Sequence, residues 1–503
     1  MEKVNGTITN FTNKCNRFFG NLPLREACQQ REKERVCNMR KAALHNLGCK
    51  VNAYETESMR RILTEAGYEI VPFEEPADVY VINTCSVTNM ADRKSRQMLH
   101  RARKRNPDSV VVAAGCYVQT SKEHAQADEA IDILIGNNRK HELAGLLERF
   151  FSEREKQKKE TQPAQEEKES SCVLVENIAE ERIYEESGVN WAGEHTRAFV
   201  KVQDGCNQFC SYCIIPYARG RVRSRNLENV LREVESLAAN GYREVVLTGI
   251  HLSSYGTDQR QPDSSAKEEV SLLTLIQKVH EIHGIDRIRL GSLEPKIVTE
   301  EFVRKLSELP KLCPHFHLSL QSGCDATLKR MNRKYTCAEY EEGCRLLRKY
   351  FTHPAVTTDV IVGFPGETDE EFEITRKFLQ KIGFFEIHIF RYSRREGTPA
   401  ARMEHQIPEQ VKAGRSDVLF ADLSRMNREF LDWYQGRELE ILMEEEIAVE
   451  GKRYFLGHTE EYVKAAVQLP DEAEWNLENK LVKARAVSVL TEDVLLAELT
   501  EGE

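Results

Sequence analysis

The sequence predicts a multidomain α/β protein in which a doubly wound α/β domain is followed by a partial (β/α)6 barrel and a small β-barrel of the OB type. Three observations support this fold class. The chain has 503 residues, enough for about three domains. Short apolar runs alternate with helical patterns in two separate series. The last part of the chain contains short β-rich runs instead.

The predicted organisation has five segments. They are a leader at 1–38, the doubly wound domain at 39–151, a linker at 152–190, the partial barrel at 191–422, and a connecting helix with the small β-barrel at 423–501. The leader shows no sustained periodicity, so we expect it to be disordered or to precede the true start of translation. The folded protein would then begin near Met39.

The composition separates the possible classes of protein. Charged residues make up 30% and hydrophobic residues 40%, which fits a soluble globular protein. Because there is no apolar run of about 18 residues and no signal peptide, we predict neither a membrane span nor secretion. Fourteen cysteines in such a chain indicate a reducing compartment, the cytoplasm, and metal or catalytic use rather than disulfides.

The first series of strands and helices predicts the doubly wound domain. Its strands are Ala42–Asn46, Asp78–Asn83, Val110–Ala114 and Ile131–Ile135. A helix after the first strand, Ala53–Ala66, ends at Gly67, and glycine is favoured directly after a helix. Alternation of this kind predicts a parallel sheet with helices on both faces.

The second series follows a polar stretch rich in Glu, Lys and Gln, which predicts the linker. Six βα-like units are fewer than the usual eight and predict an open barrel. Their strands are Phe199–Val202, Glu244–Thr248, Arg287–Leu290, His315–Leu320, Val356–Val362 and Glu386–Phe390. We interpret the polar segment Thr257–Glu269 as a surface loop.

The C-terminal part begins with a predicted helix at Pro408–Gln435. Short β-rich runs separated by turns follow it and predict the small barrel. These runs are Glu438–Met443, Val463–Val467, Leu481–Ala486 and Val489–Leu490.

The net charge of −10 argues, taken alone, against a nucleic-acid partner. The excess lies in residues 434–503, which hold 17 acidic and 7 basic side chains, so the rest of the chain is neutral overall. Three basic sets within that neutral part can each neutralise phosphates or form a solvated helix face. They are Arg93, Lys94, Arg96, Arg101, Arg103, Lys104 and Arg105; Arg219, Arg221, Arg223 and Arg225; and Lys329, Arg330, Arg333 and Lys334.

Three cysteines, Cys206, Cys210 and Cys213, lie within eight residues after a predicted strand. Three thiolates with this spacing can bind three irons of a [4Fe–4S] cube and leave the fourth iron open, which suits chemistry at that iron. A structural zinc site is the alternative, but it needs a fourth ligand, and none lies nearby in the sequence.

Cys49, Cys85 and Cys116 each follow a predicted strand of the first domain. Because the carboxyl ends of parallel strands meet at one edge of a sheet, we expect the three to converge. Single cysteines are usually buried, inert packing residues. Three of them at matching strand ends favour a second three-cysteine cluster.

Together these motifs resemble those of the radical S-adenosylmethionine (radical SAM) methylthiotransferases, over about Arg40–Glu492. The C-x₃-C-x₂-C set is the radical SAM signature, and Ile214–Gly220 continues it as in this family. The first domain is similar to the family's auxiliary-cluster domain, and the tail to its TRAM domain, an RNA-binding β-barrel. Gly48–Asn52, Thr248–Gly256 and Gly363–Thr368 resemble the MtaB type, which acts on N6-threonylcarbamoyladenosine (t6A) in tRNA.

The resemblance implies two [4Fe–4S] clusters and S-adenosylmethionine (SAM) as cofactors. Cys206, Cys210 and Cys213 would hold the cluster that cleaves SAM, and Cys49, Cys85 and Cys116 the auxiliary cluster that carries the sulfur. Polar residues at the strand ends of the barrel would hold SAM, although loop and capping roles explain such residues equally well. They are Thr248, Gly249, Ser292, Glu294, Ser319, Gln321 and Asp359.

The implied reaction adds a methylthio group to C2 of t6A next to the tRNA anticodon. The implied partners are tRNA and an electron donor such as flavodoxin or ferredoxin, and we expect a monomer. The tail would contact RNA through a narrow face, formed by Lys452, Arg453, Lys480, Lys483 and Arg485.

Two alternative functions remain open. Within the family, the substrate can be isopentenyladenosine in tRNA or a ribosomal protein. From another class, the chain can be a non-catalytic iron–sulfur or zinc protein that binds RNA. There is no Walker A pattern, which argues against nucleotide hydrolysis as an energy source.

Overall fold

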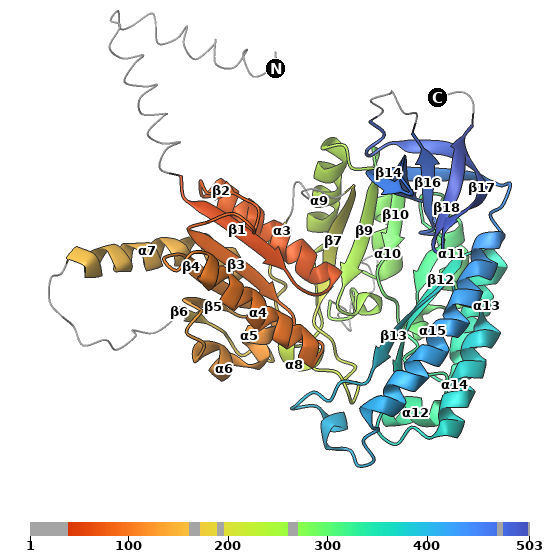
Figure 1. Ribbon diagram of the computed structural model, residues 1–503, viewed down its shortest axis with the longest axis horizontal. Helices are drawn as coiled ribbons and strands as arrows, with labels where there is room; N and C mark the ends of the chain where they lie inside the picture. The colour runs from red at the N-terminus through yellow and green to blue at the C-terminus, as the bar shows by residue number, and fades with distance from the viewer. Residues whose placement is uncertain (1–38, 160–171, 189–195, 260–269, 470–475, 501–503) are drawn as a thin grey trace, which may run out of the picture.

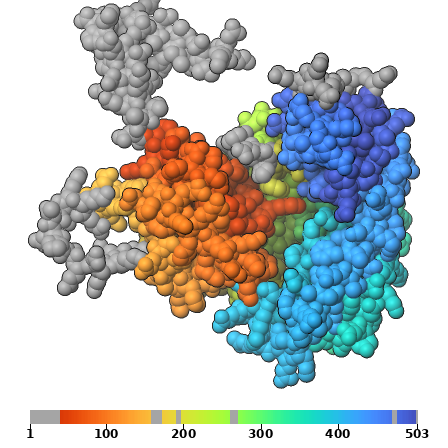
Figure 2. All heavy atoms as spheres, in the orientation of Figure 1, coloured from red at the N-terminus to blue at the C-terminus, as the bar shows by residue number. Residues whose placement is uncertain are grey.

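The computed structural model describes residues 39–159, 172–188, 196–259, 270–469 and 476–500 (Figure 1 and Figure 2). The predicted leader 1–38 lies outside this range, as does most of the predicted surface loop 257–269. The fold class predicted from the sequence is confirmed: a doubly wound domain, an open barrel and a closed small β-barrel follow one another along the chain. Within the described ranges, no helix combines the length and the apolar character needed to cross a bilayer.

The first domain is built on a six-stranded parallel sheet with strand order β2-β1-β3-β4-β5-β6. Helices α3 and α7 cover one face, and α4, α5 and α6 the other, so two apolar cores flank the sheet. The strands are β1 (Lys41–Asn46), β2 (Glu69–Ile70), β3 (Val79–Thr84), β4 (Val110–Gly115), β5 (Ile133–Ile135) and β6 (Cys172–Leu174). The helices are α3 (Lys50–Glu65), α4 (Asn89–Arg105), α5 (Cys116–Thr120), α6 (Lys122–Gln126) and α7 (Leu143–Lys159).

The predicted linker 152–190 contains regular secondary structure and buried residues that its composition did not indicate. Helix α7 continues to Lys159, and β6 then pairs in parallel with β5 as the last strand of the first sheet. Further along, Ile178 and Tyr184 are buried against the core domain. The apolar residues that perform these roles are few and scattered, so the local composition hid them. The domain boundaries themselves stay predictions.

The core domain is an open barrel made of two short sheets. One has the order β10-β9-β7-β8 and the other β11-β12-β13. Single bridges, Ile288 to Leu312 and Leu293 to Leu318, connect them. Its strands are β7 (Arg197–Asp204), β8 (Arg223–Ser224), β9 (Glu244–Gly249), β10 (Arg287–Leu290), β11 (His315–His317), β12 (Ala355–Val362) and β13 (Glu386–Arg391). All six predicted strands are present, and β8 is an additional antiparallel strand.

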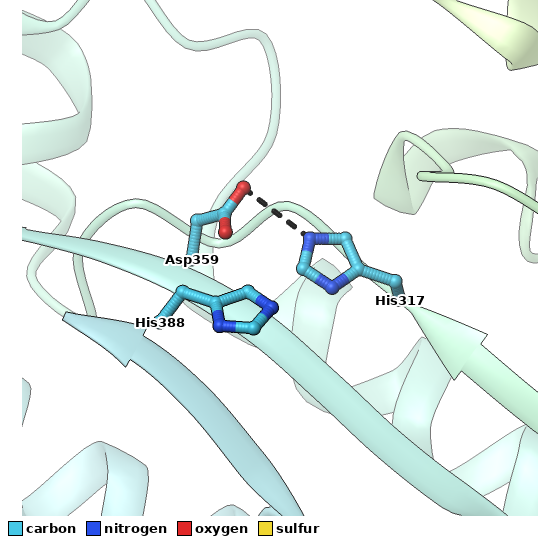
Figure 3. Close-up of side chains that lie close together, drawn as sticks. All are labelled: His317, Asp359 and His388. Carbon is cyan, nitrogen blue, oxygen red and sulfur yellow. Dashed lines mark ion pairs between the residues drawn. The ribbon is translucent and has the colours of Figure 1, made fainter. Parts of the chain in front are cut away.

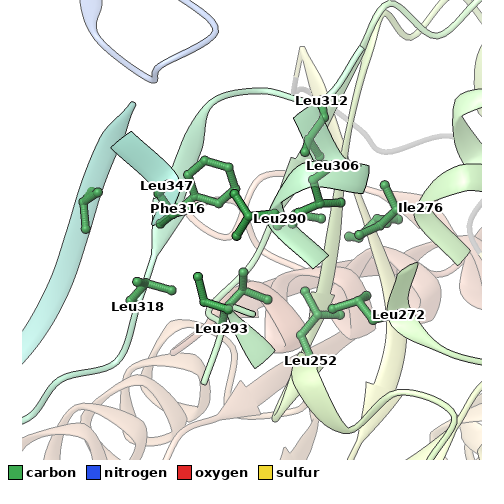
Figure 4. Close-up of a cluster of buried hydrophobic side chains, with 14 of the residues drawn as sticks. Leu252, Leu272, Ile276, Leu290, Leu293, Leu306, Leu312, Phe316, Leu318 and Leu347 are labelled. Atoms are coloured by element: carbon green, nitrogen blue, oxygen red, sulfur yellow. The ribbon is translucent and has the colours of Figure 1, made fainter. Parts of the chain in front are cut away.

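Helices cover the outside of this barrel. Leucine, isoleucine and valine side chains of the strands interlock with those of the helices in one continuous apolar core, part of which Figure 4 shows around Leu290 and Phe316. The helices are α8 (Ile215–Arg219), α9 (Leu227–Ala239), α10 (Leu272–His280), α11 (Glu300–Ser307), α12 (Asp325–Arg330), α13 (Cys337–Tyr350) and α14 (Asp369–Ile382). In the described chain no strand ladder joins β13 to β7, so the barrel is open on that side.

The C-terminal part begins with α15 (Glu409–Asp432) and closes into a barrel of order β14-β15-β16-β18-β17. Its strands are β14 (Glu438–Val449), β15 (Lys452–His458), β16 (Lys464–Gln468), β17 (Leu481–Thr491) and β18 (Val494–Leu499). The sequence missed β15, which starts with two charged residues, and β18, which follows a two-residue turn. It also split β17, because Val489–Leu490 belongs to that same strand.

The C-terminal barrel is fixed to the amino ends of the core strands. Arg287, the first residue of β10, is buried and donates to the carbonyl oxygens of His458 and Glu440, at 3.0 and 2.7 Å. Arg289 donates to the carbonyl oxygen of Glu460 at 2.7 Å. Since buried arginines need such acceptors, these bonds hold the two parts in one orientation.

Tyr462, at the turn between β15 and β16, enters the same junction. Its ring stacks on His315 of β11 and on His458, with centroids 5.0 and 4.6 Å apart. The guanidinium groups of Arg197 and Arg289 each lie 4.8 Å from the ring centroid. The amino end of the open barrel is therefore plugged by an aromatic side chain of the C-terminal barrel.

Candidate functional site

Cys206, Cys210 and Cys213 lie in the loop between β7 and α8. Gly205 starts this loop with φ +72°, and a Cβ there would lie 1.8 Å from the carbonyl oxygen of Arg221, so only glycine fits. The loop is closed by the bond from the Cys206 N–H to the carbonyl oxygen of Gly220 at 3.0 Å. Cys206 and Cys210 are buried, and Cys213 is partly buried.

The surroundings of this triad raise the pKa of two of its thiols, those of Cys206 and Cys213. Burial raises the pKa of Cys206 to about 11 and that of Cys213 to about 12. Arg333 opposes this effect, because its Nη1 lies 3.3 Å from the Sγ of Cys210 and its charge lowers the pKa of both neighbours. Thiols of this kind ionise when a metal binds them.

Cys49, Cys85 and Cys116 come together at the carboxyl edge of the first sheet, as the sequence predicted. Cys49 precedes α3, Cys85 follows β3, and Cys116 starts α5 directly after β4. Each of Cys49 and Cys85 has its pKa raised, chiefly by burial, and the charge of Cys116 contributes to both shifts. Gly48 permits this packing, because a Cβ there would lie 2.9 Å from the Cβ of Cys85.

The side chain of Cys49 is exposed, yet protein atoms surround it closely enough for burial to be the main cause that raises its pKa. The Sγ of Cys116 accepts a hydrogen bond of 3.3 Å from Asn137 Nδ2, which also donates to the carbonyl oxygen of Ala218 at 2.8 Å. Asn137 thus links the triad of Cys49, Cys85 and Cys116 to α8, the helix that follows Cys213.

The sulfur spacing of both triads fits a multi-iron group better than a single ion. Two sulfurs bound to one zinc are at most about 4.6 Å apart, since each Zn–S bond is about 2.3 Å. Among the residues that the structure describes, the three sulfurs of neither triad lie all within 4.8 Å of one another. A [4Fe–4S] cube holds its cysteines on different irons and therefore needs wider spacing. The donor sets fit two such clusters.

A buried ionic network joins the two triads. Arg219, at the end of α8, is fully buried, and its Nη1 lies 2.7 Å from Glu55 Oε1 on α3 of the first domain. Lys201 of β7 bonds to Glu55 and to Asp204, each at 2.7 Å, and Lys140 also pairs with Glu55. Sequence reasoning missed this network, because its members are spread over 165 residues without a motif.

The charges in this network compensate one another. Burial alone would raise the pKa of Glu55, but Arg219, Lys140 and Lys201 outweigh it and hold that pKa well below its usual value. Arg219 Nη2 donates to Asn52 Oδ1 at 2.6 Å, and Asn52 lies three residues after Cys49. The network therefore fixes α8, which follows Cys213, against α3, which follows Cys49.

The prediction that Arg219, Arg221, Arg223 and Arg225 contact phosphates is wrong for three of the four. Arg219, Arg223 and Arg225 are at most 3% exposed. Arg223 pairs with Asp204, and Arg225 with Glu233, so their charges are already compensated. Only Arg221 is exposed, with its guanidinium 4.7 Å from the ring centroid of Phe209 in the cysteine loop.

Two residues of the basic set at 329–334, Arg330 and Arg333, pair with carboxylates within the protein, whereas Lys329 and Lys334 are exposed. Arg333 is 6% exposed; it contacts Cys210, pairs with Glu294 at 3.1 Å, and donates to the carbonyl oxygen of Ser319 at 3.0 Å. Arg330 pairs with Glu371. Arg333 is thus a site residue that sequence reasoning assigned to phosphates, because a run of basic residues does not show which of them is buried.

Some of the candidate SAM residues lie close to the triad of Cys206, Cys210 and Cys213, and others do not. Arg333 brings Glu294 and Ser319 to the Cys210 sulfur. Thr248 is buried at the end of β9, and a Cβ on Gly249 would lie 2.9 Å from Gln203, three residues before Cys206.

The other three candidates are Ser292, Gln321 and Asp359, and the contacts of the last two lie away from the cysteine loop. Ser292 is exposed. Gln321 has φ +73° and donates its N–H to the carbonyl oxygen of Asp359 at 2.8 Å. The carboxylate of Asp359 pairs with His317 instead.

The basic helix α4 remains available to a polyanion. Five of its seven predicted residues are exposed, whereas Arg103 pairs with Asp132 and Arg105 bonds to the carbonyl oxygen of Glu74. The exposed residues are Arg93, Lys94, Arg96, Arg101 and Lys104. This helix starts four residues after Cys85 and lies on the first domain, facing solvent.

The predicted narrow RNA face of the tail does not form a single patch. All five of its basic residues are exposed. Lys452 and Arg453 pair with one end of β14, at Val449 and Ala448, whereas Arg485 pairs with its other end at Glu438. Because β14 is twelve residues long, the two groups lie far apart.

Two protein-family models match the chain. The radical SAM superfamily model matches residues 200–379, and the model of an uncharacterized protein family, UPF0004, matches residues 41–136. The first match includes the loop of Cys206, Cys210 and Cys213. The second includes the sheet edge with Cys49, Cys85 and Cys116.

Curated relatives are similar over most of their own length. The threonylcarbamoyladenosine tRNA methylthiotransferase MtaB of Bacillus subtilis (strain 168) is 42% identical, over 85% of this chain and 90% of that protein. The protein of the same name from Aquifex aeolicus (strain VF5) is 40% identical, over 81% and 93%. A tRNA-2-methylthio-N(6)-dimethylallyladenosine synthase from Acetivibrio thermocellus is 34% identical, over 89% and 88%.

A solved structure with a similar fold is the radical S-adenosylmethionine methyltransferase TsrM from Kitasatospora setae. The form with tryptophan and a SAM analogue bound has a TM-score of 0.51 at 16% identity, and the match covers 70% of this chain and 73% of that one. The form with cobalamin and a [4Fe–4S] cluster has the same TM-score and covers 72% and 77%. At this identity the likeness concerns the fold alone.

Proposed function

The chain belongs to the radical SAM methylthiotransferase family, and we propose that it adds a methylthio group to C2 of t6A next to the anticodon of tRNA. It is a tRNA-methylthiolating enzyme that uses SAM and [4Fe–4S] clusters. The observation that carries the proposal is the pair of cysteine triads on separate sheets, linked through α8 and its Arg219. That helix has five residues and is about 8 Å long, so the two sites are neighbours.

When bound, the cofactors would supply the difficult chemistry: a cluster held by Cys206, Cys210 and Cys213 would supply the radical together with SAM, and a cluster held by Cys49, Cys85 and Cys116 would supply the sulfur. The chain itself binds and orients these groups. Arg333 donates to the sulfur of Cys210 and so stabilises a thiolate there. Asn137 does the same for Cys116 with a neutral donor.

We assign SAM to the space beside Cys210. Glu294 and Ser319 border this space through their contacts with Arg333, and Thr248 and Gly249 lie beside Gln203 at its edge. His251 adds a further polar group, with its Nε2 3.5 Å from Glu294 Oε2. Ser292 and Gln321 complete the proposed set. A carboxylate such as Glu294, held in place by Arg333, can orient a ribose hydroxyl or an ammonium group.

The t6A nucleotide must leave the anticodon stack to reach the clusters, as in other enzymes that modify a base. The exposed basic residues of α4 are suited to hold the phosphates on either side, because α4 begins next to Cys85. The choice of t6A rests on the motif at Gly48–Asn52 and on the relatives with 40% identity or more, both of which carry the t6A name. The dimethylallyladenosine synthase is less similar.

Nucleoside mass spectrometry of tRNA from a strain lacking the gene tests the substrate. We expect 2-methylthio-t6A to disappear and to return when the gene is restored, while 2-methylthio-isopentenyladenosine is unchanged. The reverse pattern would move the enzyme to the dimethylallyladenosine group. Loss of neither nucleoside would point to a ribosomal protein.

Anaerobic reconstitution with SAM and dithionite separates catalysis from RNA binding alone. We expect 5′-deoxyadenosine and methylthiolated tRNA from the complete protein. An iron–sulfur or zinc protein that only binds RNA would retain tRNA but give no SAM cleavage. We further propose that the enzyme works in the cytoplasm as a monomer and takes electrons from a flavodoxin or a ferredoxin, since its cluster chemistry needs a low-potential donor.

A further inference from the structure

Three potential metal ligands meet on adjacent strands of the open barrel, and none of them belongs to either cysteine triad. His317, Asp359 and His388 come from the adjacent strands β11, β12 and β13, and their side chains point toward a common region (Figure 3). One ligand atom from each lies within 4.8 Å of the other two. No other group of three His, Cys, Asp or Glu residues in the described parts of the chain meets this condition.

The distances within this triad suit one divalent ion. The Nε2 of His317 and the Oδ2 of Asp359 are 3.3 Å apart. Two donor atoms at about 2.1 Å from one ion are separated by about 3.0 Å in octahedral and 3.4 Å in tetrahedral geometry. The imidazole rings of His317 and His388 stack at a centroid distance of 5.7 Å with an interplanar angle of 28°, so both can present a nitrogen to the same point.

A contact of the other ring nitrogen orients His317. His317 Nδ1 is 3.0 Å from the hydroxyl of Thr357, which lies on the neighbouring strand. If this nitrogen carries the proton, Nε2 is left with a free lone pair toward Asp359 and His388. Such outer contacts are typical of metal-binding histidines, because they fix the tautomer and the ring orientation.

The strand register explains why the three residues meet. Asp359 and His388 are direct partners in the parallel pairing of β12 and β13. His317 pairs with Thr357, two residues before Asp359, so all three side chains lie on the same face of the sheet. Their placement on rigid strands gives the site a fixed geometry without the help of a loop.

Charged side chains lie around the triad. Lys50, the next residue after Cys49, has a charge interaction with Glu386, and Glu386 lies 3.7 Å from Nδ1 of His388. Positively charged groups are present too. Lys50 and Arg289 lie near His315, whose ring stacks on Tyr462. An ion at the triad would be balanced by Asp359 and by the nearby Glu386.

We propose that His317, Asp359 and His388 bind one divalent first-row transition-metal ion, such as Zn²⁺, Fe²⁺ or Mn²⁺, that is separate from both iron–sulfur clusters. Two histidines and one carboxylate on one side of an ion leave coordination positions open. His388 is about half exposed, so solvent or a ligand can reach these positions. Asp359 is thereby assigned to this ion rather than to SAM.

The open positions also suggest a role, which rests on the proposed function. The threonylcarbamoyl group of t6A ends in a carboxylate, a good ligand for such an ion, whereas the isopentenyl group has no oxygen. An ion in this place would bind the carboxylate and favour t6A over isopentenyladenosine.

Metal binding is tested on the holoenzyme with both clusters in the oxidised, diamagnetic form. Anaerobic titration with Mn²⁺, followed by the EPR signal of the free ion, should show uptake of one ion per chain. Asp359→Asn and His388→Phe should each weaken uptake at least about 10-fold. His283→Phe, at an exposed histidine elsewhere, is the matched control and should bind as the wild type does. Iron content measured before and after shows that the clusters stay in place.

Equal uptake by His388→Phe and His283→Phe, or no specific uptake by the wild type, would overturn the proposal. Because His388 is about half exposed, its replacement leaves the barrel core intact, and retained iron verifies folding. Competition by Zn²⁺ gives a second readout, since Zn²⁺ binds such ligands more tightly than Mn²⁺ and should displace it.

The carboxylate step is tested by binding of an anticodon stem-loop with t6A at constant Mg²⁺, with and without added Zn²⁺. We expect Zn²⁺ to tighten binding about 10-fold for the t6A loop, not for the unmodified loop, and this gain should be lost in His388→Phe. Equal binding with and without Zn²⁺ would overturn this step. If the t6A loop does not bind at all, the proposed function fails instead.

Discussion

Arg219 of the core domain and Glu55 of the first domain form a fully buried ion pair, with Nη1 and Oε1 2.7 Å apart. The pair lies between the two cysteine triads, because Arg219 follows Cys213 by six residues and Glu55 follows Cys49 by six. A buried charge is tolerated only when its partner is present and well placed. The relative position of the two triads therefore depends on this contact.

Glu55→Gln should lower the free energy of unfolding by about 3–5 kcal/mol, because it leaves Arg219, Lys201 and Lys140 without their shared carboxylate. Urea unfolding followed by circular dichroism measures this change. Glu308→Gln is the control, since its pair with Arg304 is exposed and contributes at most about 1 kcal/mol. Similar losses in both variants would contradict a special role for the network.

Cys49→Ala should reduce the iron content from about eight to about four per chain while 5′-deoxyadenosine is still formed. The reason is that Cys49 contributes only to the triad on the first sheet, and the Cys206 loop keeps its own contacts. Methylthiolated tRNA should be absent. Cys172→Ala is the control, because Cys172 lies in β6 and belongs to neither triad. Loss of SAM cleavage in Cys49→Ala would disprove the separate roles of the two clusters.

Arg333→Met should slow SAM cleavage by about 10- to 100-fold, the effect of losing a charged hydrogen bond of about 1.5–3 kcal/mol. The side chain contacts the sulfur of Cys210 and orients Glu294, so both cluster and SAM lose a partner. Quantifying 5′-deoxyadenosine measures the rate. Arg330→Met, which removes the pair with Glu371 and a hydrogen bond to Thr327 but no contact with Cys210, should have little effect. Equal rates in the two variants would refute the assignment.

Reversing the charge of Arg93, Lys94 and Arg101 to Glu should weaken tRNA binding by at least about 10-fold and reduce its salt dependence. Each lost phosphate contact should lower the slope of log K against log salt by about 0.7–0.9. Filter binding at several salt concentrations measures both. The matched variant reverses Lys480, Lys483 and Arg485 of the tail. If only that variant weakens binding, the tail and not α4 holds the tRNA.

The thermal stability should fall as the pH drops below about 6.5. Burial and neighbouring arginines hold the pKa of His315 and of His458 below the usual value, so the unfolded chain binds more protons below pH 6.5 than the folded chain does. The loss is at most about 1.4 kcal/mol per pH unit for each histidine. Melting curves between pH 7.5 and 5.5 test this, and His315→Gln should flatten the dependence.

Most of the fold could be predicted from the sequence, because the spacing of apolar residues indicates which side chains are buried. Strands such as β3 and β4, buried on both faces, are continuous apolar runs and were found within one residue of their bounds. Strand β15 was missed because only its later residues are buried, after a charged start at Lys452. Strand β6 was missed because three residues carry no periodicity, and its place depends on the uncovered edge of β5.

The candidate site was predictable where the chemistry is local or follows strand ends. The Cys206 loop has its three sulfurs in eight residues, and the other cysteines share a position after a strand. The metal triad of His317, Asp359 and His388 was not predictable, since only the pairing of three strands brings it together. Arg333 was misassigned for a similar reason, because sequence cannot show which arginine of a basic run turns inward.

Strand β6 has a practical consequence for anyone who separates the first domain. It lies within the segment predicted as a linker, yet it pairs with Ile133, Leu134 and Ile135 of β5. A fragment ending at Phe151 would leave the backbone N–H and C=O groups of β5 unpaired at an apolar sheet edge. Such an edge pairs with strands of other molecules and leads to aggregation. A fragment that extends through Tyr184 keeps the edge paired, so expression trials should truncate there. The boundary of this folding unit is thus set by hydrogen bonding rather than by composition.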